Sequence, residues 1–352
     1  MSSRNLKLAK RLGTILGITA VLLVLLVGAW ALVPPFTRPI PGEHAIAEIQ
    51  RISLGGFEQA VLLRGNDRRN PVLLFVHGGP GSGELPIAHT YSKELEKHFV
   101  VAHWDQRGAG ASCQGVDWST LSLDLIVNDT IELAQYLGRG RKIFVIGHSW
   151  GSLVAVWAAQ RRPDLFYAYA GTGQLVHRAR QEEISYNWVV DRAKEADDAD
   201  ALQELAAIHP PYSTQAEFKL QRRWLSQYHG DVYRADRDRA LLLTKVFGPE
   251  YSLRIKINHQ RCFNRSLEVL LKDRINVDLL RDVRDFKIPV FFFLGRRDFN
   301  TPTPLVEEWA ARLSAPHVEV IWFEEAGHSL GIESPDEFQK RLVEKLLRLA
   351  RE

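Results

Sequence analysis

The chain has few cysteines and no recognisable metal-binding pattern. Cys113 and Cys262 are the two cysteines among 352 residues, which excludes a scaffold of several disulfides and a cysteine metal site. The 12 histidines show no spacing typical of metal ligands. The sequence also lacks internal repeats and low-complexity tracts. Because 45% of the residues are hydrophobic, we expect a chain with a large buried core. We expect no metal and no cofactor.

The excess of positive charge is confined to the first residues. The formal net charge is +3, but Arg4, Lys7, Lys10 and Arg11 precede every acidic residue, and the remainder without them carries −1. Nucleic-acid binding requires a basic patch on the folded domain. The composition therefore indicates no nucleic-acid partner.

The next segment, residues 12–33, contains 22 residues and no charge. This length is enough for a transmembrane helix, and the basic residues on its N-terminal side predict that residues 1–11 are cytoplasmic. The remainder of the chain would then lie outside the cytoplasm, anchored by a single span. The alternative is a cleaved signal peptide, because Ala29-Trp30-Ala31 resembles a cleavage site. That alternative predicts a secreted or periplasmic protein.

The rest of the chain divides by pattern into a linker, a core and an insertion. Residues 34–44 contain four prolines and predict a stiff linker. Residues 45–174 and 286–352 alternate apolar strands with helical patterns, which predicts a mostly parallel sheet wound with right-handed crossovers. Residues 175–285 lose this alternation and are mainly helical in pattern. We interpret them as a helical cap inserted into an α/β core.

The most informative stretch runs from Lys142 to Val156 and reads KIFVIGHSWGSLVAV. It predicts a buried strand, a sharp turn at Ser149 and a helix. Gly147 and Gly151 flank the serine, as expected where a strained turn leaves no room for larger side chains. Ser149 is therefore a candidate nucleophile, and the amide of Trp150 is a candidate donor to an oxyanion.

Three further features follow predicted strands. His77-Gly78-Gly79-Pro80-Gly81 comes directly after one strand, and the amide of Gly79 is a candidate second oxyanion donor. Asp298 and His328 follow two later strands. The carboxyl ends of parallel strands meet at one edge of a sheet, so we expect Ser149, Asp298 and His328 to converge there. The order serine, aspartate, histidine is typical of the α/β-hydrolase arrangement.

The chain resembles the proline iminopeptidase group of α/β-hydrolases from about Phe57 to Leu347. The motifs that carry the resemblance are HGGPG at residues 77–81, DQRGAGAS at residues 105–112 and GHSWGS at residues 147–152. The resemblance implies an α/β-hydrolase fold, a Ser149-Asp298-His328 triad, and Gly79 and Trp150 as oxyanion donors. It also implies release of N-terminal proline, or another small residue, from peptides.

The chain departs from the group's pattern at several places. His148 stands where the group usually has glycine, and the apolar N-terminal segment is not typical of the group. In the peptidases of the group, glutamates of the cap bind the free amino group of the substrate. Glu182 and Glu183 are candidates for that role, although adjacent glutamates on a helix also suit a solvated surface.

These observations together predict an exported, membrane-tethered serine hydrolase that acts on small peptides. A carboxylesterase, or another hydrolase of small amides or esters, is the alternative within the enzyme class. A protein that keeps the fold for binding and has lost catalysis is a further alternative. Cys113 and Cys262 are compatible with a disulfide that tethers the cap to the core and with two separate buried thiols.

Overall fold

The computed structural model describes residues 13–19, 21–22, 25, 28, 30, 33–233, 238–274 and 276–350. The predicted cytoplasmic terminus, residues 1–11, lies outside this part of the chain, as does much of the predicted anchor, residues 12–33. Among the described residues, no helix combines the length and the apolar character that crossing a membrane requires. The anchor and its orientation stay predictions.

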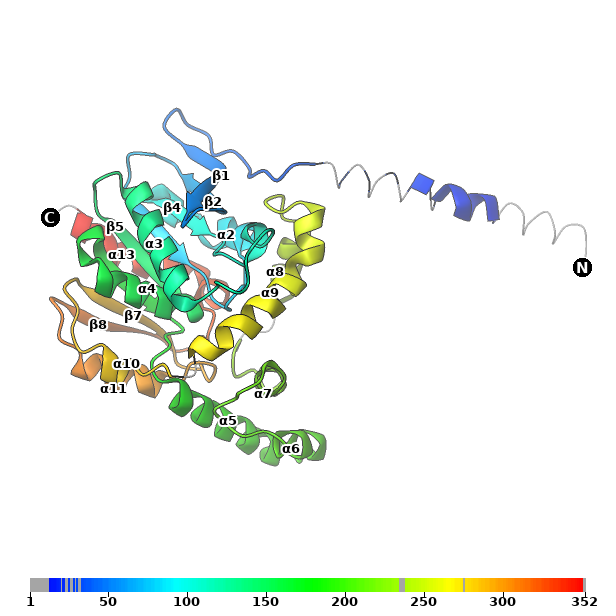
Figure 1. Ribbon diagram of the computed structural model, residues 1–352, viewed down its shortest axis with the longest axis vertical. Helices are drawn as coiled ribbons and strands as arrows, with labels where there is room; N and C mark the ends of the chain where they lie inside the picture. The colour runs from blue at the N-terminus through cyan, green and yellow to red at the C-terminus, as the bar shows by residue number, and fades with distance from the viewer. Residues whose placement is uncertain are drawn as a thin grey trace, which may run out of the picture.

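One mixed sheet organises the fold, as the alternating pattern predicted (Figure 1). Within the described residues the strand order is β1-β2-β4-β3-β5-β6-β7-β8. The strands are β1 (Ile46–Leu54), β2 (Phe57–Gly65), β3 (Val72–Val76), β4 (Val100–Trp104), β5 (Ile143–His148), β6 (Phe166–Thr172), β7 (Val290–Gly295) and β8 (Val318–Phe323). β2 is antiparallel to β1 and β4, whereas β4, β3, β5, β6, β7 and β8 run parallel. The parallel strands therefore direct their carboxyl ends to one edge.

The strands divide the interior into two cores, because successive side chains of a strand point to opposite faces. In β7, Val290, Phe292 and Leu294 belong to one core, and Phe291 and Phe293 belong to the other. Such strands read as continuous apolar runs because both of their faces are covered.

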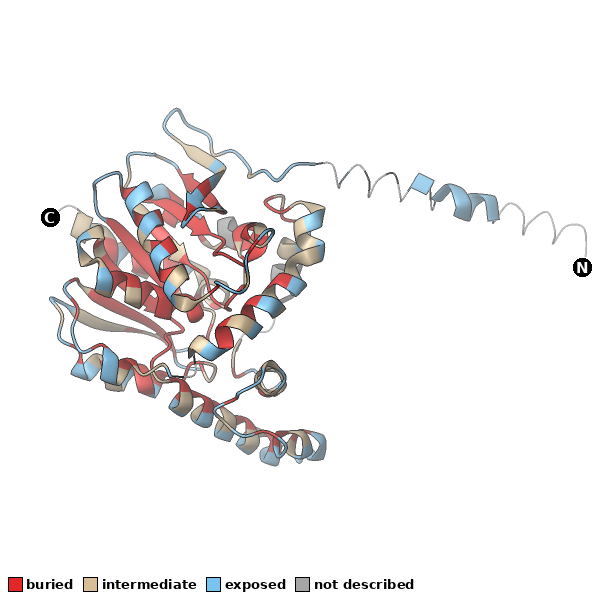
Figure 2. Ribbon diagram, in the orientation of Figure 1, coloured by how far each residue is buried: buried red, intermediate tan, exposed pale blue. Residues whose placement is uncertain are grey.

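Helices cover each face. α3 (Leu123–Gly138), α4 (Trp150–Arg161) and α11 (Thr303–Arg312) contribute buried residues to the first core, and α13 (Pro335–Leu346) contributes to the second. The remaining core helices are short: α2 (Leu85–Tyr91), η1 (Leu95–Lys97), η2 (Gly110–Ser112), η3 (Pro163–Leu165), α12 (Leu330–Glu333) and η5 (Leu347–Ala350). Figure 2 shows the buried residues concentrated in the sheet and on the helix faces that meet it.

The described chain between β6 and β7 is mainly helical. It contains α5 (Arg178–Glu195), α6 (Ala199–Leu205), α7 (Gln215–Gln227), α8 (Asp238–Phe247), α9 (Leu253–Arg274) and α10 (Leu279–Asp282). Figure 1 shows α5, α6 and α7 beyond one end of the sheet and α8 and α9 along its side. We call this insertion the cap. It has a small apolar core of its own, formed by residues such as Val189, Leu205 and Leu225.

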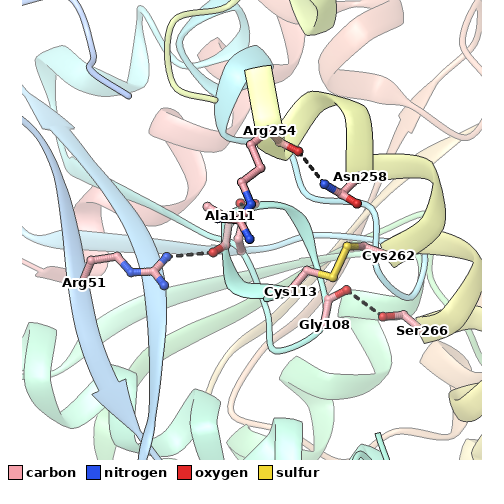
Figure 3. The surroundings of a disulfide bond; sticks show 9 residues. Arg51, Gly108, Ala111, Cys113, Arg254, Asn258, Cys262 and Ser266 are labelled. Atoms are coloured by element: carbon pink, nitrogen blue, oxygen red, sulfur yellow. Dashed lines mark hydrogen bonds between the residues drawn. A yellow bond between two sulfur atoms is a disulfide. The ribbon is translucent and has the colours of Figure 1, made fainter. Parts of the chain in front are cut away.

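A disulfide joins the cap to the core. Cys113, just after η2, is bonded to Cys262 of α9 across a sequence separation of 149 residues (Figure 3). Close by, the hydroxyl of Ser266 on α9 donates to the carbonyl oxygen of Gly108 over 2.8 Å. Of the two possibilities left open by the sequence, the structure has the tether and not separate thiols.

Candidate active site

Ser149 occupies a sharp turn between β5 and α4. Its φ of 52° and ψ of −121° are unusual for a residue other than glycine. The turn requires small neighbours on both sides. A Cβ atom on Gly147 would lie 2.5 Å from the carbonyl oxygen of Gly151, and a Cβ atom on Gly151 would overlap the carbonyl oxygen of Val76. The glycines at these two positions therefore allow the turn that presents the serine.

Asp298 and His328 meet on the loops that follow β7 and β8. Nδ1 of His328 lies 2.9 Å from Oδ2 of Asp298, and both residues are buried. Backbone N–H groups of Asn300 and Thr301 donate to Oδ1 of Asp298 over 2.9 and 2.8 Å, and the hydroxyl of Thr301 donates to Oδ2. These bonds hold the carboxylate in place. It can then orient the imidazole.

The end of β6 and the residue after it lie close to both the serine and the histidine. The backbone N–H of Ser149 donates to the carbonyl oxygen of Thr172 over 3.0 Å. The next residue, Gly173, has a φ of +52°, and a Cβ atom there would lie 2.7 Å from Cε1 of His328. Ser149 and His328 also line the same cavity, whose volume is about 440 Å³. The structure thus brings the three predicted residues to one end of the sheet.

The acid–base properties of His328 reflect two opposing effects. Burial disfavours its charged form, but the charge of Asp298 and the hydrogen bond to it favour that form. The carboxylate of Asp231 adds to the second effect, and the net result is a pKa of His328 above its usual value. A neutral imidazole whose Nδ1–H is held by Asp298 leaves Nε2 able to accept a proton.

The two predicted oxyanion donors come from the loop after β3 and from the start of α4. Gly79, with a φ of +118°, lines the cavity, and Trp150 is the first residue of α4. The ring N–H of Trp150 donates to Gln106 over 3.1 Å, which secures the start of the helix. The role of these two amides stays a prediction.

The loop after β4 braces the glycine-rich loop after β3. The backbone N–H of Gln106 donates to Nε2 of His77 over 3.1 Å, and the Gln106 side-chain amide donates to the carbonyl oxygen of His77 over 2.7 Å. Arg107 forms a buried ion pair with Asp129. The DQRGAGAS motif therefore positions the loop that carries Gly79.

His148 is the unusual residue beside the serine. Its ring centroid lies 4.9 Å from that of His328, and both rings line the cavity. Burial, together with repulsion from His328 and His77, lowers the pKa of His148 to about 3. His148 is therefore neutral at physiological pH, and it adds ring surface rather than charge to the cavity.

The structure does not bring the two predicted amine-binding glutamates to the cavity. Glu182 is fully buried within the cap, where it pairs with Arg178 and accepts the backbone N–H of Tyr212 over 2.8 Å. Glu183 is exposed. The acidic residues that line the cavity are instead Glu84 and Asp231 among the described residues. No local sequence motif distinguishes them from other acidic residues.

The chain has relatives in sequence and a similar fold among solved structures. Residues 71–335 match the α/β-hydrolase fold family. A probable aminopeptidase of Bacillus subtilis (strain 168) is 30% identical over 310 residues, which cover 86% of this chain and 97% of that protein. A probable proline iminopeptidase of Leptolyngbya boryana is 28% identical over 76% of this chain and 83% of its own length. In structure, a proline iminopeptidase-related protein of Thermus thermophilus has a TM-score of 0.62 at 22% identity, covering 86% of this chain and 99% of that one.

Proposed function

The chain belongs to the α/β-hydrolase fold family as a proline iminopeptidase-like, peptidase-type hydrolase, and we propose that it is a serine aminopeptidase. Its substrates would be short peptides from which it releases an N-terminal proline or another small residue. The observation that carries this proposal is the buried Asp298–His328 pair, 2.9 Å apart, at the cavity that Ser149 also lines.

The proposed mechanism assigns one step to each residue. His328 accepts the proton of the Ser149 hydroxyl through Nε2 while the serine oxygen attacks the carbonyl carbon of the first peptide bond. Asp298 stabilises the imidazolium that forms. The amides of Gly79 and Trp150 hold the oxyanion, and a donor of this kind contributes roughly 3 kcal/mol in comparable sites.

Collapse of this intermediate breaks the peptide bond. His328 gives its proton to the leaving amine, and the N-terminal residue remains as an ester on Ser149. His328 then takes a proton from water, which attacks that ester and releases the amino acid. The cycle ends with Ser149 protonated and His328 neutral, so it requires no cofactor.

The substrate's ammonium group requires an acidic partner near the serine. Asp231 and Glu84 line the cavity, and we propose them for this role. Glu182 and Glu183 do not line it and are therefore the weaker candidates. Asp231 lies beside the histidine: its backbone carbonyl oxygen accepts the N–H of His328 over 2.7 Å, and its carboxylate favours the charged form of His328 and so raises the pKa of that residue.

We also propose that the enzyme acts outside the cytoplasm, tethered by residues 12–33, or free if that segment is cleaved. The Cys113–Cys262 disulfide supports this placement, because disulfides persist mainly in oxidising compartments.

The test is kcat/KM of the full chain in detergent for proline 4-nitroanilide and for a short-chain nitrophenyl ester, with Ser149→Ala as the control. Preference for the anilide that disappears in the variant is expected. Turnover of the ester alone would identify a carboxylesterase, the alternative enzyme. The serine mechanism proposed above would still apply to it. Failure of a fluorophosphonate to label Ser149 would indicate a binding protein instead.

A further inference from the structure

The cavity beside Ser149 is lined by more basic than acidic side chains. Among the described residues, Lys219 and Arg222 reach it from α7 and Lys245 from α8, whereas Glu84 and Asp231 are the acidic members. Burial raises the pKa of Glu84 to about 7, so this group is only partly charged at neutral pH. The cavity therefore carries a net positive charge.

Two of these basic groups, Lys219 and Arg222, have hydrogen-bond partners that are neutral. Nζ of Lys219 donates to the neutral side-chain oxygen of Asn264 over 2.8 Å. Burial lowers the pKa of Arg222, and the two carboxylates that oppose this effect, Glu182 and Asp231, form no ion pair with it among the described residues. Glu182 is already occupied by Arg178.

Two nitrogens of the Arg222 guanidinium have no hydrogen-bond partner. Nη1 donates to the side-chain oxygen of Gln221, and the guanidinium stacks over Phe218 with Cζ 4.7 Å from the ring centroid. Nε and Nη2 are buried and have no hydrogen-bond partner. These two nitrogens form the edge of the guanidinium that binds a carboxylate through two parallel hydrogen bonds.

A buried, unsatisfied guanidinium edge is costly unless a ligand completes it. We propose that Arg222 binds the free C-terminal carboxylate of the substrate, so that the enzyme selects dipeptides and tripeptides. Lys219 and Lys245 add to the attraction. This inference rests on the proposed peptidase function. It adds that the enzyme selects substrates by length through their C-terminal end.

The size and composition of the cavity agree with a short peptide. Its volume of about 440 Å³ lies toward the small end of ligand sites. The cap helices α7, α8 and α9 contribute Phe218, Lys245 and Phe263 to its lining, together with the loops that carry Ser149 and His328. A long peptide would have to leave past these helices with its carboxylate beyond the reach of Arg222.

The test measures binding without turnover. The full-length Ser149→Ala protein is titrated calorimetrically with Pro-Gly and with Pro-Gly amide, which lacks the carboxylate. We expect Pro-Gly to bind at least about tenfold more tightly, as a charge-assisted, bidentate pair provides. Adding Arg222→Gln should abolish this preference, and Arg222→Lys, which keeps the charge but not the fork, should retain part of it.

Arg223→Gln is the matched control. Arg223 lies next to Arg222 on α7, but it is exposed and pairs with Glu204. The preference should survive this change. Thermal unfolding of each variant shows whether a loss of binding comes from loss of the fold. A preference for Pro-Gly that is partly retained in Arg222→Lys would also show that the site is still folded.

Several results would overturn the inference. They are equal affinity for the acid and the amide, a preference that persists in Arg222→Gln, and no measurable binding of either peptide. Acetate and inorganic phosphate are titrated in parallel, and equal binding of either would identify a site for free anions instead. Hydrolysis of proline 4-nitroanilide, which has no carboxylate, tests the proposed function separately, so either idea can fail without the other.

Discussion

Asp298 and His328 are 30 residues apart, yet Oδ2 of the first lies 2.9 Å from Nδ1 of the second. They follow β7 and β8, which are parallel neighbours in the sheet. The same carboxylate is held by Thr301, whose hydroxyl lies 2.7 Å from Oδ2 and 3.1 Å from Nδ1 of His328. The imidazole therefore has a fixed orientation and a raised pKa before any substrate binds.

Replacing the carboxylate tests its role in catalysis. Asp298→Asn should lower kcat/KM by about 10⁴-fold, because the amide favours the wrong imidazole tautomer. Activity requires neutral His328 and falls as pH drops through its pKa. Since Asp298 raises that pKa, the acid limb of the residual activity should move to lower pH.

Glu324→Gln is the control for this change. Glu324 also follows β8, but it is exposed and pairs with Arg296. The Glu324→Gln change should leave both kcat/KM and its pH profile unchanged. A larger loss in Glu324→Gln than in Asp298→Asn would mean that the acid of the site has been misassigned.

The glycine after the serine turn is required by packing. Gly151→Ala places a Cβ atom against the carbonyl oxygen of Val76, and backbone cannot move as easily as a flexible side chain. We expect a loss of unfolding free energy of about 2 kcal/mol or more, measured by urea denaturation. Gly138→Ala in α3 makes only an ordinary contact of 3.4 Å with Ile143 and should be neutral or slightly stabilising. Equal stability of the two variants would contradict the packing argument.

The disulfide should contribute strongly to stability. It closes a loop with a sequence separation of 149 residues, and linking residues so far apart restricts the unfolded chain. The double variant Cys113→Ser, Cys262→Ser should lose about 4 kcal/mol of unfolding free energy. A reductant should destabilise the wild type by a similar amount and leave the double variant unaffected. An effect of the reductant on both proteins would point to another cause.

The buried carboxyl of Asp105 should make stability depend on pH. It accepts the backbone N–H of Ala111 and the hydroxyl of Tyr251, both over 2.7 Å, but burial raises its pKa to about 7. In the unfolded chain the pKa is near its usual value of 3.8. Between pH 3.8 and about pH 7 the carboxyl of Asp105 is therefore protonated in the folded state and ionised in the unfolded state. The stability that the bound proton gives to the folded state is lost as pH rises toward 7.

The measurement is the difference in unfolding free energy between the wild type and Asp105→Asn. It should fall by about 1.4 kcal/mol per pH unit between about pH 5 and pH 6.5, and then level off. For Asp164→Asn, at an exposed carboxyl whose pKa is lowered by Arg162, the difference should be constant over the same range. A constant difference for Asp105→Asn would show that this carboxyl does not titrate there.

Much of the fold could be predicted because local patterns determine it. The apolar runs before Ser149 and before Asp298 each form a strand covered on both faces, and such strands need no partner to be recognised in a sequence. The glycines around Ser149 are also a local signal. They are required by backbone atoms only a few residues away or on the adjacent strand.

The contents of the cavity could not be predicted in the same way. Glu182 and Asp231 are both cap carboxylates, but Arg178 one helical turn away pairs with the first in the cap interior, and the second lines the cavity together with His328. The sequence suggested Glu182 as a substrate-binding residue and offered no reason to choose Asp231, Glu84 or Arg222 for such a role. Which side chains converge depends on how the cap packs on the sheet.

The sequence by itself determined the order of strands and helices, the serine turn and the identities of the histidine and aspartate. These features depend on residues close together in the chain or on the common edge of a parallel sheet. Only the tertiary structure decided that Cys113 meets Cys262, that Glu182 lies away from the cavity, and that Arg222 lines the cavity and has two buried nitrogens without partners. Burial and ion pairing between distant residues are set by packing, and no local pattern records them.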